Sequence, residues 1–449
     1  MILVMLVVLF LSLAVGASIA TSLGLTAITY FLTGGGTRLL FLIPQRFFAG
    51  CNSFELIAIP LFVLAGDLML EGHISKALVN LAKSLVGWMQ GSLALVTTLA
   101  CMFFGAVSGS GPATTSAIGS IVAKPMEEER YPKSYTSAVL ACSGPLGSLI
   151  PPSILMVVYG AATNTSISKM LLAGIGPGIL FGVIFMAYEG YVGRKKKYGK
   201  VAPFSVQTLL SSLREGVWAL MAPLIILGGI YGGIFTPTEA AAVAVFYSLF
   251  VGMFILKKIT WRTLPGILYR SSVTTGVIMV VVGTVAAFGY AITRAGIPQQ
   301  LSLAATSLVK TPLVFLIIAQ VILLVAGMFM NGSAAILLLA PLLAPTVIQY
   351  GIDPVFFGAV MVANLAIGMY TPPVAVCSYV ASRITGVSFD ETNRALVPFL
   401  ILSLVALALA GLPPGDHVHS QRPFVAGRAQ DRARGQVILQ WTRLGSGRR

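Results

Sequence analysis

The chain has 449 residues, of which 57% are hydrophobic and only 10% are charged, and its mean hydropathy is +0.91. Soluble domains carry roughly 25% charged residues, so this composition excludes soluble enzymes, nucleic-acid-binding proteins and disulfide scaffolds. It predicts an all-α polytopic protein embedded in a lipid bilayer. The net charge of +15 is no nucleic-acid footprint, because the basic residues lie mostly in short loops, where they report membrane orientation.

Stretches without Asp, Glu, Lys or Arg mark the expected spans. The first covers Met1–Thr37, and because it has neither a basic start nor a small-residue cleavage site we expect a single retained helix there. The later stretches cover 84–123, 134–168, 170–188, 216–238, 240–256, 271–293, 311–352, 354–382 and 395–415.

Two of these stretches, 84–123 and 311–352, are too long for one spanning helix of about 20 residues. Small polar residues interrupt both near the middle, at Ser108–Pro112 and at Asn331–Ser333. After the first interruption, 112–123 would extend only about 18 Å as a helix, against a hydrocarbon core of about 30 Å. We therefore expect two helical hairpins, of which the first is re-entrant.

A shift of 221 residues reveals an internal repeat. It places Ser110–Ala113 on Asn331–Ala334, and Gly147–Pro152 on Gly368–Pro373. The second pair shares the pattern G-x-x-x-P-P inside an apolar stretch. Because proline lacks the N–H that a helix needs, each half should consist of a hairpin followed by a broken helix.

Charge predicts how the two halves are oriented. Arg194–Lys200 is the most basic loop and is therefore expected in the cytoplasm. Counting spans from it places the base of the first hairpin (Lys124) in the cytoplasm, and the base of the second (Lys310, Asp353) outside. The repeat is then inverted, which is the architecture of secondary transporters.

The expected organisation is one membrane transporter unit over 1–412. Its inverted repeats cover about 54–192 and about 272–412, and scaffold helices at about 216–257 link them. The remaining residues, 413–449, form a polar, Arg-rich tail that we expect to be disordered and dispensable.

The two hairpin tips, Ser108–Gly111 and Asn331–Ser333, are candidate ion and substrate sites. Unwound backbone offers carbonyls, and hydroxyl side chains add oxygen ligands for a hard cation. The alternative is a packing seam of small residues. The double prolines should free carbonyls that need a partner in lipid; a sodium ion or neighbouring helices could supply it.

Two further polar residues are candidates for binding the substrate. Asn364 is a buried amide in the second broken helix, and a hydrogen bond between helices is an equal alternative. Arg46 lies in a short amphipathic segment, where it would anchor at lipid headgroups or contact a substrate carboxylate.

Three acidic residues have structural explanations. Thr236–Glu239 has the T-x-x-E pattern of a helix N-terminal capping box, with proline at the first helical position. Asp67 and Glu71 end the second span and should be solvated or paired with Lys76, with a role in proton transfer as the alternative. We find no acidic residue in the middle of a span, no HExxH motif and no GxxxxGK[ST] motif, so neither an intramembrane enzyme nor ATP hydrolysis is expected.

Five segments together resemble the signatures of the large membrane subunit of tripartite ATP-independent periplasmic (TRAP) transporters. They are Phe47–Met69, Phe104–Gly111, Leu146–Ser153, Gly233–Ala241, and Gly351–Pro354 with Thr371–Pro373. The resemblance covers about residues 1–412.

The resemblance implies sodium-coupled import of an organic acid, a dicarboxylate or a sugar acid such as sialic acid, across the bacterial inner membrane. It implies a periplasmic substrate-binding protein and a small four-helix membrane subunit as partners, an elevator motion, and sodium ions as coupling ions without another cofactor. Carried onto this chain, the sodium ligands are Ser108, Ser110, Gly147, Pro151, Asn331, Ser333, Gly368, Thr371 and Pro372. The substrate-binding candidates are Ser110, Asn331, Asn364 and Arg46.

The chain departs from the family pattern at two places. Asn331 follows Met330 where an acidic residue is usual, and the tail after Leu412 replaces a short stub. A self-sufficient sodium–carboxylate symporter of similar inverted-repeat build is the alternative function.

Overall fold

The computed structural model describes residues 2–35, 40–72, 74–199, 203–297 and 311–411, together with 300, 303 and 309. The tail 413–449 and Lys310 lie outside the described residues. Seven helices of the described part are long and apolar enough to cross a membrane, or eight if a pair bent by 60° counts as one span. The expected all-α polytopic architecture is thus confirmed.

The N-terminal stretch differs from the single helix that we expected. It forms two helices, α1 (Ile2–Ala14) and α2 (Ile19–Gly35), which pack against each other. The turn between them contains Gly16, whose φ of +87° is in the left-handed region that glycine adopts without strain. A helix over the whole stretch would measure about 55 Å, well beyond the hydrocarbon core, so its length already required a turn.

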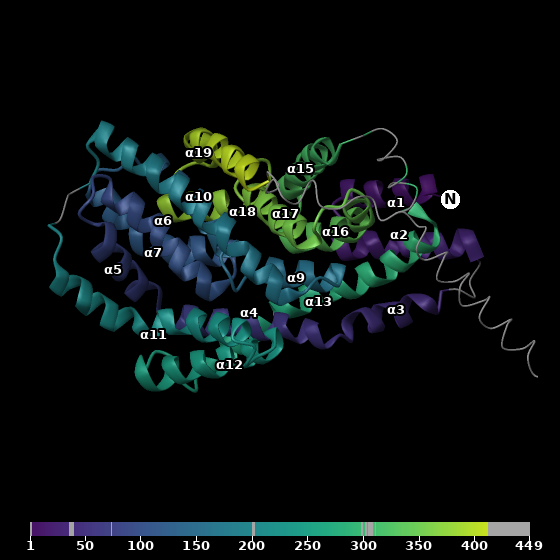
Figure 1. Ribbon diagram of the computed structural model, residues 1–449, viewed down its shortest axis with the longest axis horizontal. Helices are drawn as coiled ribbons and strands as arrows, with labels where there is room; N and C mark the ends of the chain where they lie inside the picture. The colour runs from purple at the N-terminus through teal and green to yellow at the C-terminus, as the bar shows by residue number, and fades with distance from the viewer. Residues whose placement is uncertain are drawn as a thin grey trace, which may run out of the picture.

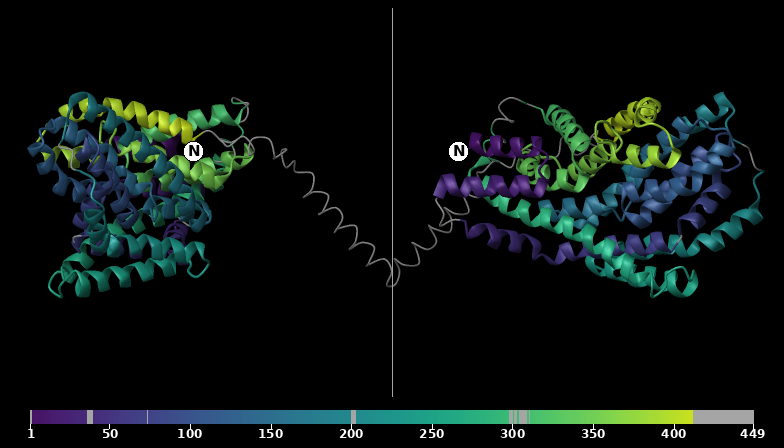
Figure 2. Two further views of the ribbon diagram at one scale, coloured as in Figure 1. Left: turned by 60° about the vertical axis from the view of Figure 1, so that its left-hand side comes forward. Right: turned by 180° about the vertical axis from the view of Figure 1, so that it is seen from behind.

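One layer of helices runs along one side of the molecule (Figures 1 and 2). It contains α3 (Leu42–Cys51), η2 (Phe54–Ile57), α4 (Ala58–Glu71), α11 (Val206–Tyr231), α12 (Pro237–Phe250), η4 (Val251–Ile255) and α13 (Leu264–Arg294). Within it, α4 packs on α12, and α13 packs on α3 and α4. The helix α5 (Ile74–Val86) connects this layer to the first hairpin through its contacts with α11 and α6.

The other layer holds the hairpins and the broken helices (Figure 1). The first hairpin consists of α6 (Ser92–Ser108) and α7 (Gly111–Glu128), and the second of α15 (Pro312–Phe329) and α16 (Gly332–Gln349). The limb α7 is longer than expected, because the helix continues through Lys124 to Glu128. Charge-free stretches therefore underestimate a limb whose end is polar.

Both expected helix breaks are present. In the first half, α8 (Lys133–Ser143) continues into the 3-10 helix η3 (Gly144–Ser148), and α9 (Ile154–Thr163) starts after the prolines. In the second half, α17 (Pro354–Gly368) and α18 (Val376–Thr385) flank the break. A long helix ends each half, α10 (Ile167–Lys196) and α19 (Phe389–Ala410).

Each hairpin crosses its broken helix at a pair of glycines. A Cβ on Gly105 would lie 2.5 Å from the Cα of Gly147, and one on Gly368 would lie 2.7 Å from the Cα of Gly327. Carbon atoms do not approach so closely, so only glycine permits these crossings. The two crossings occupy equivalent places in the repeat, within one residue of the shift of 221.

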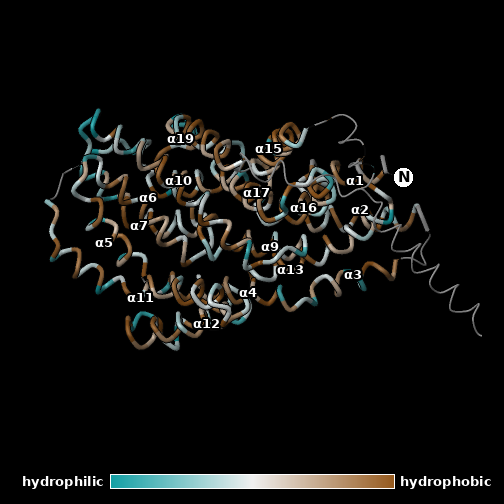
Figure 3. Tube along the Cα trace, in the orientation of Figure 1, coloured by the Kyte–Doolittle hydropathy of each residue, from teal (hydrophilic) through white to brown (hydrophobic). Residues whose placement is uncertain are grey.

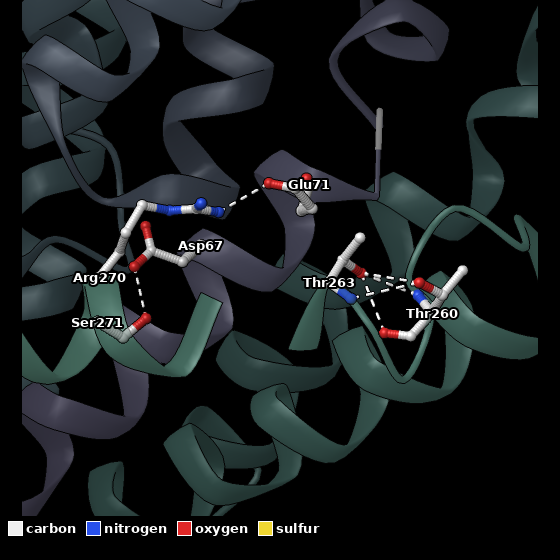
Figure 4. A network of polar contacts seen from close by, with 6 residues as sticks. All are labelled: Asp67, Glu71, Thr260, Thr263, Arg270 and Ser271. Atoms are coloured by element: carbon white, nitrogen blue, oxygen red, sulfur yellow. Dashed lines mark hydrogen bonds and ion pairs between the residues drawn. The ribbon is translucent and has the colours of Figure 1, made fainter. Parts of the chain in front are cut away.

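Two polar contacts fasten α4 to α13 (Figure 4). Ser271 Oγ donates to Asp67 Oδ2 over 2.5 Å, and Arg270 Nη2 pairs with Glu71 Oε2 at 2.7 Å. The structure thus gives these carboxylates partners on α13, where we had expected solvent or Lys76. Their partners come from a helix about 200 positions later in the chain, which local spacing cannot reveal.

The start of α12 has the expected cap. Thr236 accepts a hydrogen bond from the Glu239 N–H and its own N–H donates to Glu239 Oε2, so the capping box at the start of α12 is confirmed. The trace is hydrophobic along most helices (Figure 3), and the last turn of α10 carries the basic residues Arg194–Lys196.

The glycine crossings lead to a stability prediction. Gly105→Ala should lower the free energy of unfolding by about 1–3 kcal/mol, because its methyl group would overlap the Gly147 backbone. Gly176→Ala is the matched control, since a Cβ there meets nothing within 4 Å. Thermal unfolding of the purified variants would measure the difference, and equal melting temperatures would contradict the crossing.

Candidate functional site

A cavity of about 830 Å³ lies where the two hairpin tips meet. The tips contribute Gly109–Pro112 and Met330–Ala334, and the breaks contribute Ser148, Gly368 and Met369. One further wall is formed by residues 273–281 of α13, and Ser18–Ala20 at the start of α2 close another side. The cavity therefore lies between the hairpin tips and the layer that contains α13.

The cavity wall has the symmetry of the repeat. Residues 109–112 and 330–333 both line it and are related by the shift of 221, as are 154–155 and 375–376. Ser148 and Met369 are a further such pair, and Ser148 Oγ lies 3.8 Å from Met369 Sδ. Contact between these equivalent residues places the cavity where the two repeats meet.

The first tip is held by a cluster of hydroxyl groups. Ser108 Oγ lies 2.9 Å from Thr114 Oγ1, which donates to the Ser110 carbonyl over 2.8 Å. The Gly111 N–H donates to Ser148 Oγ over 2.8 Å, so the broken helix caps the start of α7. Ser110 lines the cavity, whereas Ser108 is buried behind it.

The second tip has a simpler structure. Asn331 is the N-cap of α16, and its Oδ1 accepts a hydrogen bond from the Ser333 N–H over 3.1 Å. Both residues line the cavity. An aspartate would cap the helix in the same way, so the asparagine removes a charge from this tip without changing its local structure.

Each break is bonded to its own hairpin. The Ile154 N–H donates to the Gly109 carbonyl over 3.4 Å, and the Val374 N–H donates to the Met328 carbonyl over 3.3 Å. Both bonds join the residues after the prolines to the end of the first limb. The tip and the break in each half therefore form one unit.

Protein groups already bond three of the four carbonyls that the prolines release. In an unbroken helix, the residues at the two Pro-Pro pairs would donate to the carbonyls four positions earlier. Ser148 O accepts from Ser153 Oγ over 2.5 Å, Gly368 O from the Thr371 N–H over 3.2 Å, and Met369 O from the Cys377 N–H over 2.9 Å. The breaks thus satisfy most of these carbonyls with their own residues, and neither an ion nor a neighbouring helix is needed for them.

The remaining candidates lie away from the cavity wall. Asn364 Nδ2 donates to the carbonyl of Gln320 over 2.8 Å and to its Oε1 over 2.5 Å, the interhelix hydrogen bond that we held as the alternative. The Arg46 guanidinium lies 4.0 Å from the centre of the Tyr290 ring, a cation–π contact between α3 and α13. The cavity wall also does not include Ser108, Gly147, Pro151, Thr371 or Pro372.

Four residues of interest were missed by the sequence analysis. Ser148, Met369 and Thr114 contact the tips, and the shift of 221 pairs Ser148 with Met369. Glu189 is fully buried within the span α10, so the expectation that the spans lack acidic residues needs correction. It directly follows the charge-free stretch 170–188, whose end we took as the end of the apolar segment.

The chemistry of the cavity suits a small anion. None of its described lining residues is charged, but two helices begin at it, α7 at Gly111 and α16 at Gly332. A helix N-terminus carries about half a positive charge and free N–H groups, which favour anions. Hydroxyl, amide and carbonyl oxygens lie beside them, and these are ligands for a hard cation.

The sequence matches one family model, "Tripartite ATP-independent periplasmic transporter, DctM component", over residues 6–415. It is 41% identical to the C4-dicarboxylate TRAP transporter large permease protein DctM of Pseudomonas aeruginosa, covering 85% of this chain and 91% of the relative. It is 36% identical to the sialic acid TRAP transporter large permease protein SiaM of Vibrio cholerae, covering 89% and 93%. The isethionate TRAP transporter permease protein DctMQ of Oleidesulfovibrio alaskensis is 39% identical over 90% of this chain, which spans 64% of that relative.

Two solved structures share the fold. The YdaH transporter of Alcanivorax borkumensis aligns with a TM-score of 0.59 at 15% identity, covering 85% of this chain and 89% of the other. MtrF of Neisseria gonorrhoeae aligns with a TM-score of 0.58 at 14% identity, covering 85% of each chain. At these identities the likeness concerns the fold alone. The family match and the relatives show that this chain belongs to the DctM family, the large permease components of TRAP transporters. It is a multi-pass protein of the inner membrane rather than an enzyme.

Proposed function

We propose that this permease imports an organic acid together with sodium ions. A periplasmic binding protein delivers the acid, and a small four-helix membrane subunit accompanies the large one. The observation that carries the proposal is the cavity between the two repeats, which both hairpin tips line. Transporters with inverted repeats bind their substrate and coupling ions at such a position.

An organic acid suits the cavity for electrostatic reasons. Its lining has no cationic side chain among the described residues, so a carboxylate would be held by the N-termini of α7 and α16. Three relatives are named for acids: a C4-dicarboxylate, sialic acid and isethionate. Their variety supports the class of substrate and leaves the individual acid open.

The donor atoms at the tips fit sodium. Around the first tip, Ser108, Ser110 and Thr114 place two hydroxyl groups and a carbonyl within 3.5 Å of one another. Hard monovalent cations prefer such neutral oxygen donors. We assign Ser108, Ser110, Gly147 and Pro151 to one sodium site, and Asn331, Ser333, Gly368, Thr371 and Pro372 to the other.

Sodium can drive the transport. Each positive charge that enters down a potential of 100 mV contributes about 2.3 kcal/mol. The sequence contains no phosphate-binding loop for ATP. In the proposed elevator motion, the two hairpins and broken helices move together against the layer that contains α13.

Uptake should therefore require an inward sodium gradient. Proteoliposomes that contain the permease and its small subunit, supplied with the binding protein, would be loaded with a sodium gradient or with choline in its place. We expect uptake of the acid only with sodium. Full uptake in choline under a proton gradient would contradict sodium coupling.

Substitutions at the tips should change the response to sodium. Ser110→Leu would fill space at the first tip and leave polar groups unpaired, at a cost of about 1–3 kcal/mol, or about five- to 150-fold in apparent affinity. Asn331→Asp keeps the cap of α16 but adds a negative charge, so it should raise the apparent affinity for sodium.

The measurement is the sodium dependence of uptake at matched expression. Ser120→Leu serves as the control, because Ser120 is on the exposed face of α7 away from the cavity. If all variants have the sodium dependence of the wild type, the tips are packing elements and the site assignment fails.

A further inference from the structure

Glu189 is a carboxylic acid buried in the interior of the first repeat. It is 0% exposed and lies in α10, inside a membrane span. Thr98 Oγ1 on α6 donates to its Oε1 over 2.6 Å, and Thr98 Oγ1 lies 2.7 Å from Ser143 Oγ on α8. A chain of two hydroxyl groups therefore leads from α8 through α6 to the carboxyl group.

No positive charge compensates Glu189 among the described residues. The ion pairs of the described part are Lys133 with Glu127 and Arg270 with Glu71. Glu189 Oε2 is also buried and has no hydrogen-bond partner among these residues.

The titratable groups that face Glu189 are cysteines and tyrosines, which are ordinarily uncharged near pH 7. These groups are Cys101 on α6, Cys142 and Tyr135 on α8, and Tyr131 just before α8, with Tyr188 adjacent on α10. The helix α17 and the segment η3 carry no titratable side chain, and α9 carries Tyr159, bonded to the Pro354 carbonyl. On α19, Phe399 packs on the tyrosines of this region, and the charged residues Asp390, Glu391 and Arg394 are exposed.

We propose that Glu189 is a proton-binding site, occupied when the permease is folded and active. An ionised carboxylate in this apolar surrounding would lack both a counter-charge and hydrogen bonds for one oxygen, which is costly. With a proton on Oε2, the group is neutral and Oε1 remains the acceptor of the Thr98 hydroxyl. A sodium ion fits less well, because only Thr98 and Ser143 add side-chain oxygens.

The second repeat supports a neutral group at this place. The shift of 221 places Ser143 on Asn364, whose amide bonds Gln320 on the first limb of the second hairpin. Ser143 likewise bonds Thr98 on the first limb of the first hairpin. Both repeats thus join hairpin and broken helix through a polar contact, uncharged in the second repeat.

The proton would stabilise the packing of α10 against α6, the helix that ends at the first hairpin tip. Around Glu189, α10 packs closely on its neighbours: a Cβ on Gly193 would meet the Gly91 backbone, and one on Gly182 would meet the Met102 side chain. Loss of the proton would draw water to the carboxylate and separate these helices. The site is distinct from the cavity and does not depend on which acid is transported or on sodium coupling.

Infrared spectroscopy of the whole permease tests the proposal directly. The wild type should show the C=O stretching band of a protonated carboxylic acid at neutral pH, and Glu189→Gln should lack it. Thr98→Val should keep the band but move it to higher wavenumber, because the carbonyl loses its hydrogen bond. Thr98→Val also tests the site if Glu189→Gln fails to fold. A spectrum without the band in the wild type, or a band unchanged in both variants, would overturn the proposal.

Uptake measured with equal pH on both sides of the membrane gives a second test. Uptake would be measured between about pH 6 and about pH 10. Above the midpoint of the Glu189 titration, the wild type should lose activity about tenfold per pH unit, because the fraction of permease with a protonated Glu189 falls. Glu189→Gln should not show this loss, whereas the exposed control Glu215→Gln should follow the wild type. Identical profiles for wild type and Glu189→Gln would overturn the proposal. So would a loss of bound sodium in Glu189→Gln, which would indicate a cation in place of the proton.

Discussion

The backbone contact between glycines at the crossing of hairpin and broken helix is the constraint on which the rest of the structure depends. In lipid, apolar side chains give no hydrophobic force between helices, so close van der Waals packing and hydrogen bonds must hold them. At Gly105 on Gly147, and at Gly327 against Gly368, the backbones touch. This contact fixes the distance between the first limb of each hairpin and the break, and thereby the position of each tip.

The cavity follows from these crossings and from the symmetry. A backbone hydrogen bond joins each tip to its own break. Ser148 contacts Met369, so the two breaks meet between the repeats. Two helix N-termini then meet across one space whose walls carry no charge among the described residues. A binding site for an anion therefore arises from helix ends and backbone, without a cationic side chain.

Much of this arrangement could be predicted from the sequence, because the repeat itself is a sequence signal. The shift of 221 and the double prolines located the tips, the breaks and their pairing between the two halves. Contacts between remote helices could not be predicted, since no spacing encodes them. Arg46 lies on Tyr290, and Ser271 bonds Asp67, because α3 and α4 pack on α13. The charge-free stretches also ended before the true end of α7. Glu189 directly follows such a stretch, so its burial inside α10 was not predicted.

The central claim is that one site between the two repeats is shared by both tips. A double-mutant cycle with Ser110→Ala and Ser333→Ala, measured on the apparent sodium affinity of uptake, tests it most directly. Residues of one site should show a coupling energy of about 0.5–3 kcal/mol. Strictly additive effects, within about 0.5 kcal/mol, would place the two serines in separate environments and contradict the account.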